Sequence, residues 1–249
     1  LIAAILGPEV SRYSFDFFHD YIYLATYLFA AIIQIINFVI LIFIKIKKPQ
    51  LSKKSHRPLS DILLQKNLII AILAAAVGYS LMSFIMTATP LQIVNVCKLG
   101  DSASATVIQW HVIAMFAPSF FTGTIINSLG NRKVMMIGLF LYAFSISFTI
   151  IGQTIEHFWI ALFLCGLGWN FLYVGGSDII AKSAFPEERA KVQGVTDFII
   201  FIFVATGSFL AGALHSSLGW EIMMFYTSIP ILILFVSIII IKPDGIKAV

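Results

Sequence analysis

Apolar residues fall into seven long runs that are separated by short segments richer in polar residues. Each run is close to the roughly 20 residues that an α-helix needs to cross about 30 Å of hydrocarbon. Because backbone groups in lipid must be bonded within their own segment, each run predicts a membrane-spanning helix. The predicted spans are Leu24–Ile44, Leu68–Thr87, Thr106–Ile126, Val134–Ile151, Phe158–Gly176, Val195–Leu214 and Met223–Ile241.

Composition supports the same fold class, since the chain is 59% hydrophobic and only 11% charged. Soluble domains carry about 25% charged residues, and the segments between the runs are too short to hold one. The sequence therefore predicts an all-α polytopic membrane protein. The short apolar run Leu1–Gly7 is interpreted as the outer end of an earlier span that Gly7–Pro8–Glu9 terminates, so we expect the chain to be a fragment.

The positive charges predict which ends of the spans face the cytoplasm. Fourteen of the sixteen Lys and Arg residues lie in alternate segments: residues 45–66, the loops after Ile126 and Gly176, and the C-terminal tail. Basic loops stay in the cytoplasm, so these segments and the C-terminus are expected there. Residues 45–57 are interpreted as a solvated linker beside anionic lipid, not a nucleic-acid site, because no aromatic residue interrupts the basic run.

The spans predict three parts along the chain. Residues 1–44 are expected to be the remnant of a preceding half, residues 45–66 a cytoplasmic central loop, and residues 67–249 a bundle of six spans. Six compact spans behind a long loop are typical of one half of a two-half transporter.

One loop resembles a known family signature. The segment Gly123-Thr-Ile-Ile-Asn-Ser-Leu-Gly130-Asn-Arg132-Lys133 is similar to the G-x-x-x-D-R-x-G-R-R/K loop of the major facilitator superfamily. Asn127 stands where the family has Asp and Ser128 where it has Arg, which weakens the expected charge clamp.

A second segment, Phe185-Pro-Glu-Glu-Arg-Ala-Lys-Val-Gln-Gly194, resembles the P-E-E-R-x-x-x-x-G stretch that opens the family's eleventh helix. The resemblance extends over essentially the whole chain. It implies the end of helix five, helix six, the central loop and helices seven to twelve of a bacterial-type permease. The implied function is secondary transport of a small solute by alternating access, by a monomer in the bacterial inner membrane, with a proton as a candidate coupled ion. No cofactor, metal or nucleic acid is expected.

Polar residues inside spans are costly and are therefore candidates for function. His111 titrates in a range that suits proton coupling or a hydrogen bond to substrate; the alternative is a neutral histidine bonded to a carbonyl of a neighbouring helix. Asn170 and Tyr173 share a small and polar stripe with Gly166 and Ser177, and for Asn170 cavity lining and helix-to-helix bonding stay open. The substrate-cavity candidates are His111, Gln109, Asn170, Tyr173, Met86, Thr89, Gln34 and Asn37.

Charges at the cytoplasmic ends predict a conformational latch. Asp178 and Asp197 lie there, and the resemblance implies ion pairs that form when the inside is shut and break when it opens. The alternative is a static surface bridge worth under about 1 kcal/mol. Glu187 and Glu188 are assigned no part in it. The latch candidates are Arg132, Lys133, Asp197, Asp178, Gly123 and Gly130.

Two other classes of function stay open: a membrane-embedded enzyme and a non-transporting receptor or scaffold. An enzyme that used His111 as a base would need a second catalytic group, a metal or a phosphate cluster. The sequence holds no H-x-x-x-D, D-x-x-D, H-E-x-x-H or nucleotide-loop motif, so we assign no catalytic residue. The six C-terminal spans alone are expected not to transport.

Overall fold

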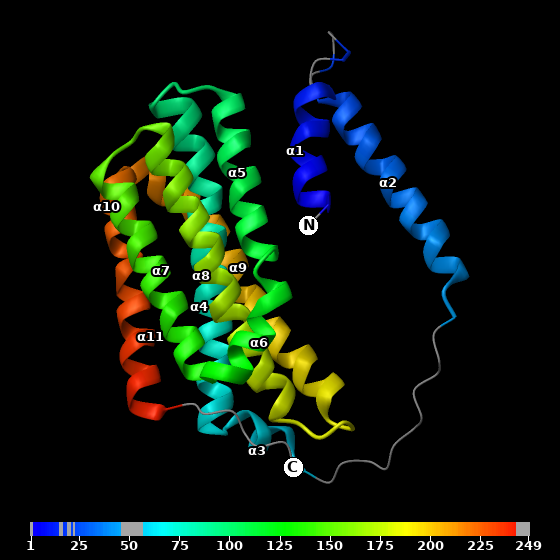
Figure 1. The fold of residues 1–249 in the computed structure, drawn as a ribbon, viewed down its shortest axis with the longest axis vertical. Coiled ribbons are helices and arrows are strands. Elements are labelled where there is room, and N and C mark those ends of the chain that lie inside the picture. Colours follow the sequence, from blue (N-terminus) through cyan, green and yellow to red (C-terminus); the bar gives the residue numbers. More distant parts are fainter. Residues whose placement is uncertain (1, 15–16, 19–20, 22, 46–56, 243–249) are drawn as a thin grey trace. The chain divides into compact units, whose positions relative to one another are not determined.

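A computed structural model describes residues 2–14, 17–18, 21, 23–45 and 57–242. The chain divides into two compact units, Leu1–Lys53 and Lys54–Val249, which are described separately below. Figure 1 shows that both units are built from helices.

The first unit holds α1 (Ile2–Ser14) and α2 (Leu24–Phe43), joined side by side by a 2.8 Å hydrogen bond between the hydroxyls of Ser14 and Thr26. The prediction that a helix ends at Gly7–Pro8–Glu9 is wrong, because α1 continues through Pro8. A proline removes a single backbone donor, and a segment in lipid tolerates it. The predicted span Leu24–Ile44 is confirmed as α2, whose most apolar stretch has no buried residues in this unit.

The second unit contains the other six predicted spans. Its elements are α3 (Leu59–Leu63), α4 (Lys66–Pro90), a π-helical segment η1 (Leu91–Val96), α5 (Asp101–Phe116), α6 (Ser119–Leu129), α7 (Asn131–Ile151), α8 (Ile155–Lys182), α9 (Arg189–Leu218), α10 (Trp220–Tyr226) and α11 (Ser228–Ile241). Among the described residues of the whole chain, six helical stretches are long and apolar enough to span a membrane, or seven if a bent pair is one span. The polytopic all-α fold class is confirmed.

Several helices run beyond the apolar runs that predicted them. The run Leu68–Thr87 lies inside a helical stretch that continues from Lys66 to Val96, 31 residues in all. The extension passes Pro90, which cannot donate a backbone hydrogen bond, and the wider π-helical turns of η1 follow directly. Hydrophobicity marks the part of a helix in lipid, and it says little about where the helix ends.

The span predicted at Thr106–Ile126 is broken in the middle. Helices α5 and α6 meet at Ala117–Pro118 with a bend of 44°. Pro118 supplies no backbone donor to the preceding turn, and prolines are among the usual causes of sharp kinks. A proline in the middle of a predicted span favours a kink, and the structure has one at Pro118.

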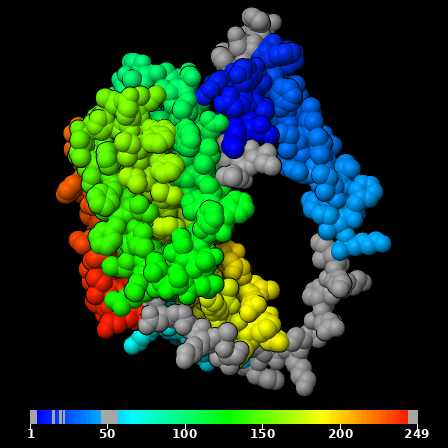
Figure 2. All heavy atoms as spheres, in the orientation of Figure 1, coloured from blue at the N-terminus to red at the C-terminus, as the bar shows by residue number. Residues whose placement is uncertain are grey.

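Helix α8 is the centre of the bundle and packs against α7, α4 and α5 (Figure 1). Small residues allow this close approach. A Cβ atom added to Gly166 would lie 2.6 Å from the carbonyl oxygen of His111 in α5, and one added to Gly176 would lie 2.7 Å from that of Ala71 in α4. The space-filling view shows α5 to α8 covering one face of the unit (Figure 2). Any side chain at these glycines would force the helices apart.

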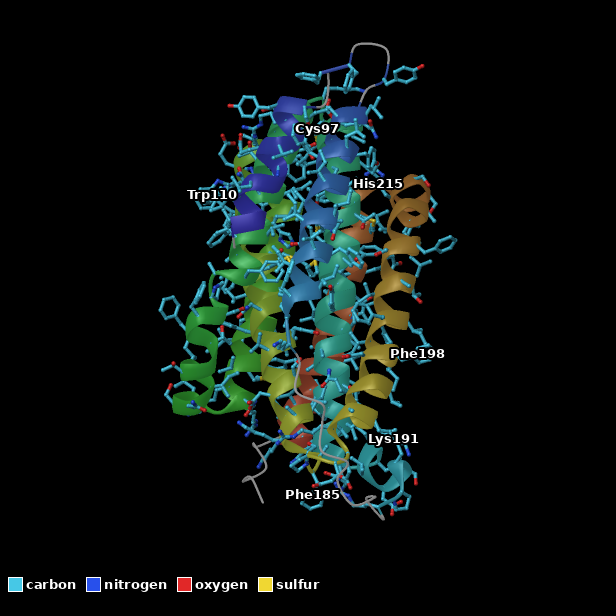
Figure 3. The ribbon with its side chains drawn as sticks, turned by 90° about the vertical axis from the view of Figure 1, so that its right-hand side faces the viewer. Cys97, Trp110, Phe185, Lys191, Phe198 and His215 are labelled. Atoms are coloured by element: carbon cyan, nitrogen blue, oxygen red, sulfur yellow. The ribbon has the colours of Figure 1, made fainter. Side chains whose placement is uncertain are left out.

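Helix α9 lies at the edge of the bundle and packs mainly on α4. Two hydrogen bonds join the pair: the Ser80 hydroxyl donates to the Phe203 carbonyl at 2.8 Å, and the hydroxyls of Ser83 and Ser208 lie 2.6 Å apart. The rest of α9 is largely exposed, and Figure 3 shows Phe198 projecting away from the helix. Exposed apolar side chains in such numbers fit contact with lipid or with another membrane-embedded surface.

Most described cations of the second unit gather at one end of the bundle, here named the basic end. Phe185 and Lys191 mark this end in Figure 3, and Cys97 and His215 lie toward the opposite one. Antiparallel spans bring alternate loops to the same end, which is the arrangement that the charge pattern predicted. The cations at the basic end are Arg57, Lys66, Arg132, Lys133, Lys182, Arg189, Lys191 and Lys242.

Candidate functional site

The side chain of Asn170 in α8 bridges the break between α5 and α6. Its Nδ2 donates to the Met115 carbonyl at 2.7 Å and to the Ser119 hydroxyl at 2.7 Å. Its Oδ1 accepts from the Thr122 hydroxyl at 2.6 Å. Asn170 is fully buried, and both of its amide hydrogens and its oxygen are engaged. The geometry is that of a helix-to-helix bond, and a role in lining a cavity stays a prediction.

His111 lies in α5 and is fully buried against α8. Its Nδ1 is 2.7 Å from the Leu162 carbonyl oxygen. A carbonyl can only accept, so in the neutral ring Nδ1 carries the hydrogen and Nε2 has the lone pair. Nε2 is buried without a hydrogen-bond partner. The histidine thus adopts the predicted alternative of a bond to a neighbouring helix, and it also keeps one nitrogen able to take a proton.

The other cavity candidates differ in burial and in the contacts that they make. Tyr173 is half-buried and stacks on Trp169, and Met86 is half-buried against the core. Thr89 is buried and donates to the Ile85 carbonyl of its own helix at 2.7 Å. Gln109 in α5 is half-buried, and Gln34 and Asn37 are exposed on α2 in the first unit. Their assignment to a substrate cavity stays a prediction.

At the basic end, Asp178 joins α8 to the start of α7. Its Oδ2 accepts from Lys182 Nζ at 2.6 Å, and it also accepts from Asn131 Nδ2 at 2.8 Å. The same amide nitrogen of Asn131 donates to the Gly175 carbonyl at 2.9 Å. Lys182 lies one helical turn after Asp178 on α8. Asn131, nearly fully buried, was not identified from the sequence.

The remaining latch candidates make other contacts. Asp197 accepts from Gln193 Nε2 at 2.7 Å within α9, and no ion pair in the described part of the chain includes Asp197, Arg132 or Lys133. Gly123 on α6 has open space around it. Gly130 separates α6 from α7 at φ 84°, a backbone conformation that side chains other than glycine rarely adopt. The latch itself stays a prediction.

An ion pair of the basic end that makes two hydrogen bonds was missed from the sequence. Arg57 Nη2 donates to Glu188 Oε2 at 2.6 Å, and its Nε donates to Oε1 at 3.1 Å. The arginine also lies over the Phe185 ring, with Cζ 4.8 Å from the centroid. Glu188 is only 4% exposed. The ion pair connects the segment before α3 to the loop between α8 and α9. In the sequence, the P-E-E-R motif was the one feature that could have indicated Glu188 as a partner.

A second polar cluster lies at the opposite end of the bundle. Gln92 of η1 donates from Nε2 to Gln153 Oε1 at 2.7 Å, and its Oε1 lies 2.8 Å from His215 Nε2. The Cys97 thiol donates to Gln153 Oε1 at 3.3 Å. These contacts join η1, the α7–α8 loop and the end of α9. Only their tertiary placement reveals these contacts, because Gln92 and Cys97, Gln153 and His215 belong to three different segments.

The fold and these contacts define a polytopic α-helical membrane protein with one broken span. The family model described as "Major Facilitator Superfamily" matches residues 72–248. The chain therefore belongs to the major facilitator superfamily, as its two loop motifs indicated. No solved structure matches the chain.

Three curated relatives are transporters by name. The riboflavin transporter RfnT of Brucella anthropi is 38% identical over 100% of this chain and 63% of its own length. The uncharacterized MFS-type transporters YdeG and YddS of Bacillus subtilis are 35% and 30% identical, over 59% and 68% of this chain and 35% and 39% of their own lengths. The chain thus spans less than two thirds of each of these relatives.

Proposed function

We propose that this chain forms part of a secondary transporter that moves a small solute across a membrane by alternating access, and that riboflavin is the first solute to test. The observation that carries the proposal is its similarity, along the whole chain, to a protein named as a riboflavin transporter. A span broken near the middle of a bundle also favours transport, since discontinuous helices often form solute sites near the midplane. The relatives' names favour a transporter over an enzyme.

The orientation and surroundings belong to the same proposal. The basic end faces the cytoplasm, together with the C-terminus, and the protein lies in a bacterial inner membrane as a monomer. The gathering of cations at one end of the bundle supports this orientation. Contacts at that end, including those of Asp178, would change between the inward-open and outward-open states.

Solute counterflow tests the transport activity without assuming a direction. The complete reading frame that contains this chain is reconstituted in vesicles that are preloaded with unlabelled riboflavin, and labelled riboflavin is added outside. We expect the label to enter at least tenfold faster than in protein-free vesicles. The matched control is a Phe209→Leu variant, because Phe209 is 80% exposed on α9. Entry at the protein-free rate would remove riboflavin as the solute.

We further propose that His111 couples transport to a proton. His111 Nδ1 already carries a hydrogen, which it donates to the Leu162 carbonyl, so Nε2 is the atom that takes the proton. No described ion pair includes His111. His111→Asn places an amide nitrogen near the position of Nδ1 and removes the titratable ring. We expect counterflow to continue while accumulation driven by an imposed pH gradient falls at least fivefold. Unchanged gradient-driven accumulation would show that His111 has only a packing role.

A further inference from the structure

Five aromatic rings from four helices converge in the second unit, and they are here named the aromatic cluster. Trp169 and Tyr173 of α8 stack with centroids 5.1 Å apart and an interplanar angle of 8°. Tyr79 of α4 meets both rings edge-on, each at 5.4 Å. Phe116 of α5 lies 5.8 Å from Trp169, and Phe201 of α9 lies 5.7 Å from Tyr79. No other ring contacts in the described residues join as many helices.

The solvent exposure of the rings increases from the centre of the cluster to its edge. Trp169 is 5% exposed, Tyr79 and Tyr173 are half-buried, and Phe116 and Phe201 are 44% and 52% exposed. Tyr79, Trp169 and Phe201 each lie near the middle of their spans. The cluster therefore presents ring surface outside the bundle at the depth of the membrane midplane.

One polar atom of the aromatic cluster lacks a hydrogen-bond acceptor. Trp169 Nε1 is buried and has no hydrogen-bond partner. Buried indole N–H groups usually find an acceptor, and an unpaired one destabilises the folded protein because it has lost its hydrogen bonds to water. By contrast, the indole of Trp220 donates to the Thr149 carbonyl at 3.0 Å. A ligand with an acceptor at the edge of a flat ring would supply what Trp169 lacks.

We propose that the aromatic cluster binds the flat heteroaromatic ring of the transported solute, an inference that rests on the proposed transport function. The ring enters where Phe116 or Phe201 is exposed and stacks on the cluster. Trp169 Nε1 is buried without the solute, so the side chains that cover it shift and let it donate to a carbonyl or ring nitrogen of the solute. Stacking of a heteroaromatic ring on an aromatic side chain stabilises the bound state, because both rings present a flat π-face. The polar atoms of the cluster are neutral hydroxyls and an indole N–H, so the ring that they fit is neutral, as the flavin ring is at pH 7.

The test measures riboflavin binding to the complete reading frame in detergent micelles, followed by quenching of flavin fluorescence. Trp169→Phe keeps a ring and removes the donor, Phe201→Leu removes exposed ring surface, and Phe209→Leu is the control on the same helix. We expect the first two variants to bind about tenfold more weakly and the control to bind like the wild type. Lumichrome, the ring without its ribityl chain, should compete with riboflavin, and ribitol should not.

The outcomes separate this inference from the transport proposal. Equal binding by all three variants, or competition by ribitol but not by lumichrome, would overturn the role of the cluster even if the wild type transports riboflavin. If the wild type binds riboflavin through the cluster but gives no counterflow of it, binding by the cluster stands and riboflavin transport fails. A wild-type protein that carries a non-aromatic solute and binds no riboflavin would overturn the cluster's role and leave transport intact.

Discussion

Replacing Asn170 by leucine is expected to lower the free energy of unfolding by about 3 kcal/mol. The substitution removes the donors to Met115 and Ser119 and the acceptor for Thr122. It leaves the Met115 carbonyl inside the bundle without its Asn170 donor, three residues before Pro118, which supplies no backbone donor. Unfolding in mixed detergent micelles, with increasing sodium dodecyl sulfate, measures the change.

The control is Asn127→Leu on α6, where the side chain is exposed, and it should change the free energy by less than about 0.5 kcal/mol. A double variant with Pro118→Ala adds a sharper comparison. Alanine restores the missing backbone donor, so the span can straighten and part of the loss caused by Asn170→Leu should be recovered. Strictly additive effects would mean that Asn170 does not stabilise the bend.

The second large effect is expected at Gly166, where alanine should destabilise the protein by about 2 kcal/mol. The new Cβ would lie 2.6 Å from the His111 carbonyl oxygen and 3.1 Å from the Met115 backbone nitrogen. Backbone atoms of a packed helix cannot step aside as the end of a long side chain can. Helices α5 and α8 must therefore separate, which weakens every contact between them.

Gly212→Ala on α9 is the matched control, and it should have the opposite sign. No atom lies within 4 Å of a Cβ at Gly212. Alanine is favoured over glycine in a helix by about 0.5–1 kcal/mol, so this variant should be slightly stabilised. The two free energies of unfolding, measured side by side, decide the matter. A stabilised Gly166→Ala variant would contradict the close packing of α5 on α8.

The membrane spans and the break at Pro118 could be predicted because both depend on local sequence. Hydrophobic length identifies a span, and a missing backbone donor predicts a kink wherever the partner helices lie. The ends of the helices were less predictable, since α4 and η1 continue to Val96 and α1 continues past Pro8. In both places the helix crosses a proline, and only Pro8 lay in a segment that the sequence analysis interpreted as a terminus.

The partners of the candidate residues depend on which helices pack together, and a single sequence does not show this. His111 was identified as a polar residue in a span, but its bond to Leu162 depends on the packing of α5 on α8, which approach closely at Gly166. Trp169 was not identified from the sequence, although it is the ring that joins Tyr79, Phe116 and Tyr173. Hydrophobic periodicity and composition can identify candidate residues in a sequence. The packing of the helices determines which partners those residues contact.

The bond between Arg57 and Glu188 joins positions 131 residues apart, which has a consequence for biosynthesis. At about 5–20 residues per second, a ribosome needs roughly 7–26 s to add the second partner after the first. Throughout that interval the arginine must wait in water or against lipid headgroups while four spans are inserted. The ion pair between Arg57 and Glu188 therefore forms late in assembly. It forms only in a nascent chain whose α8–α9 loop has reached the same side of the membrane as Arg57.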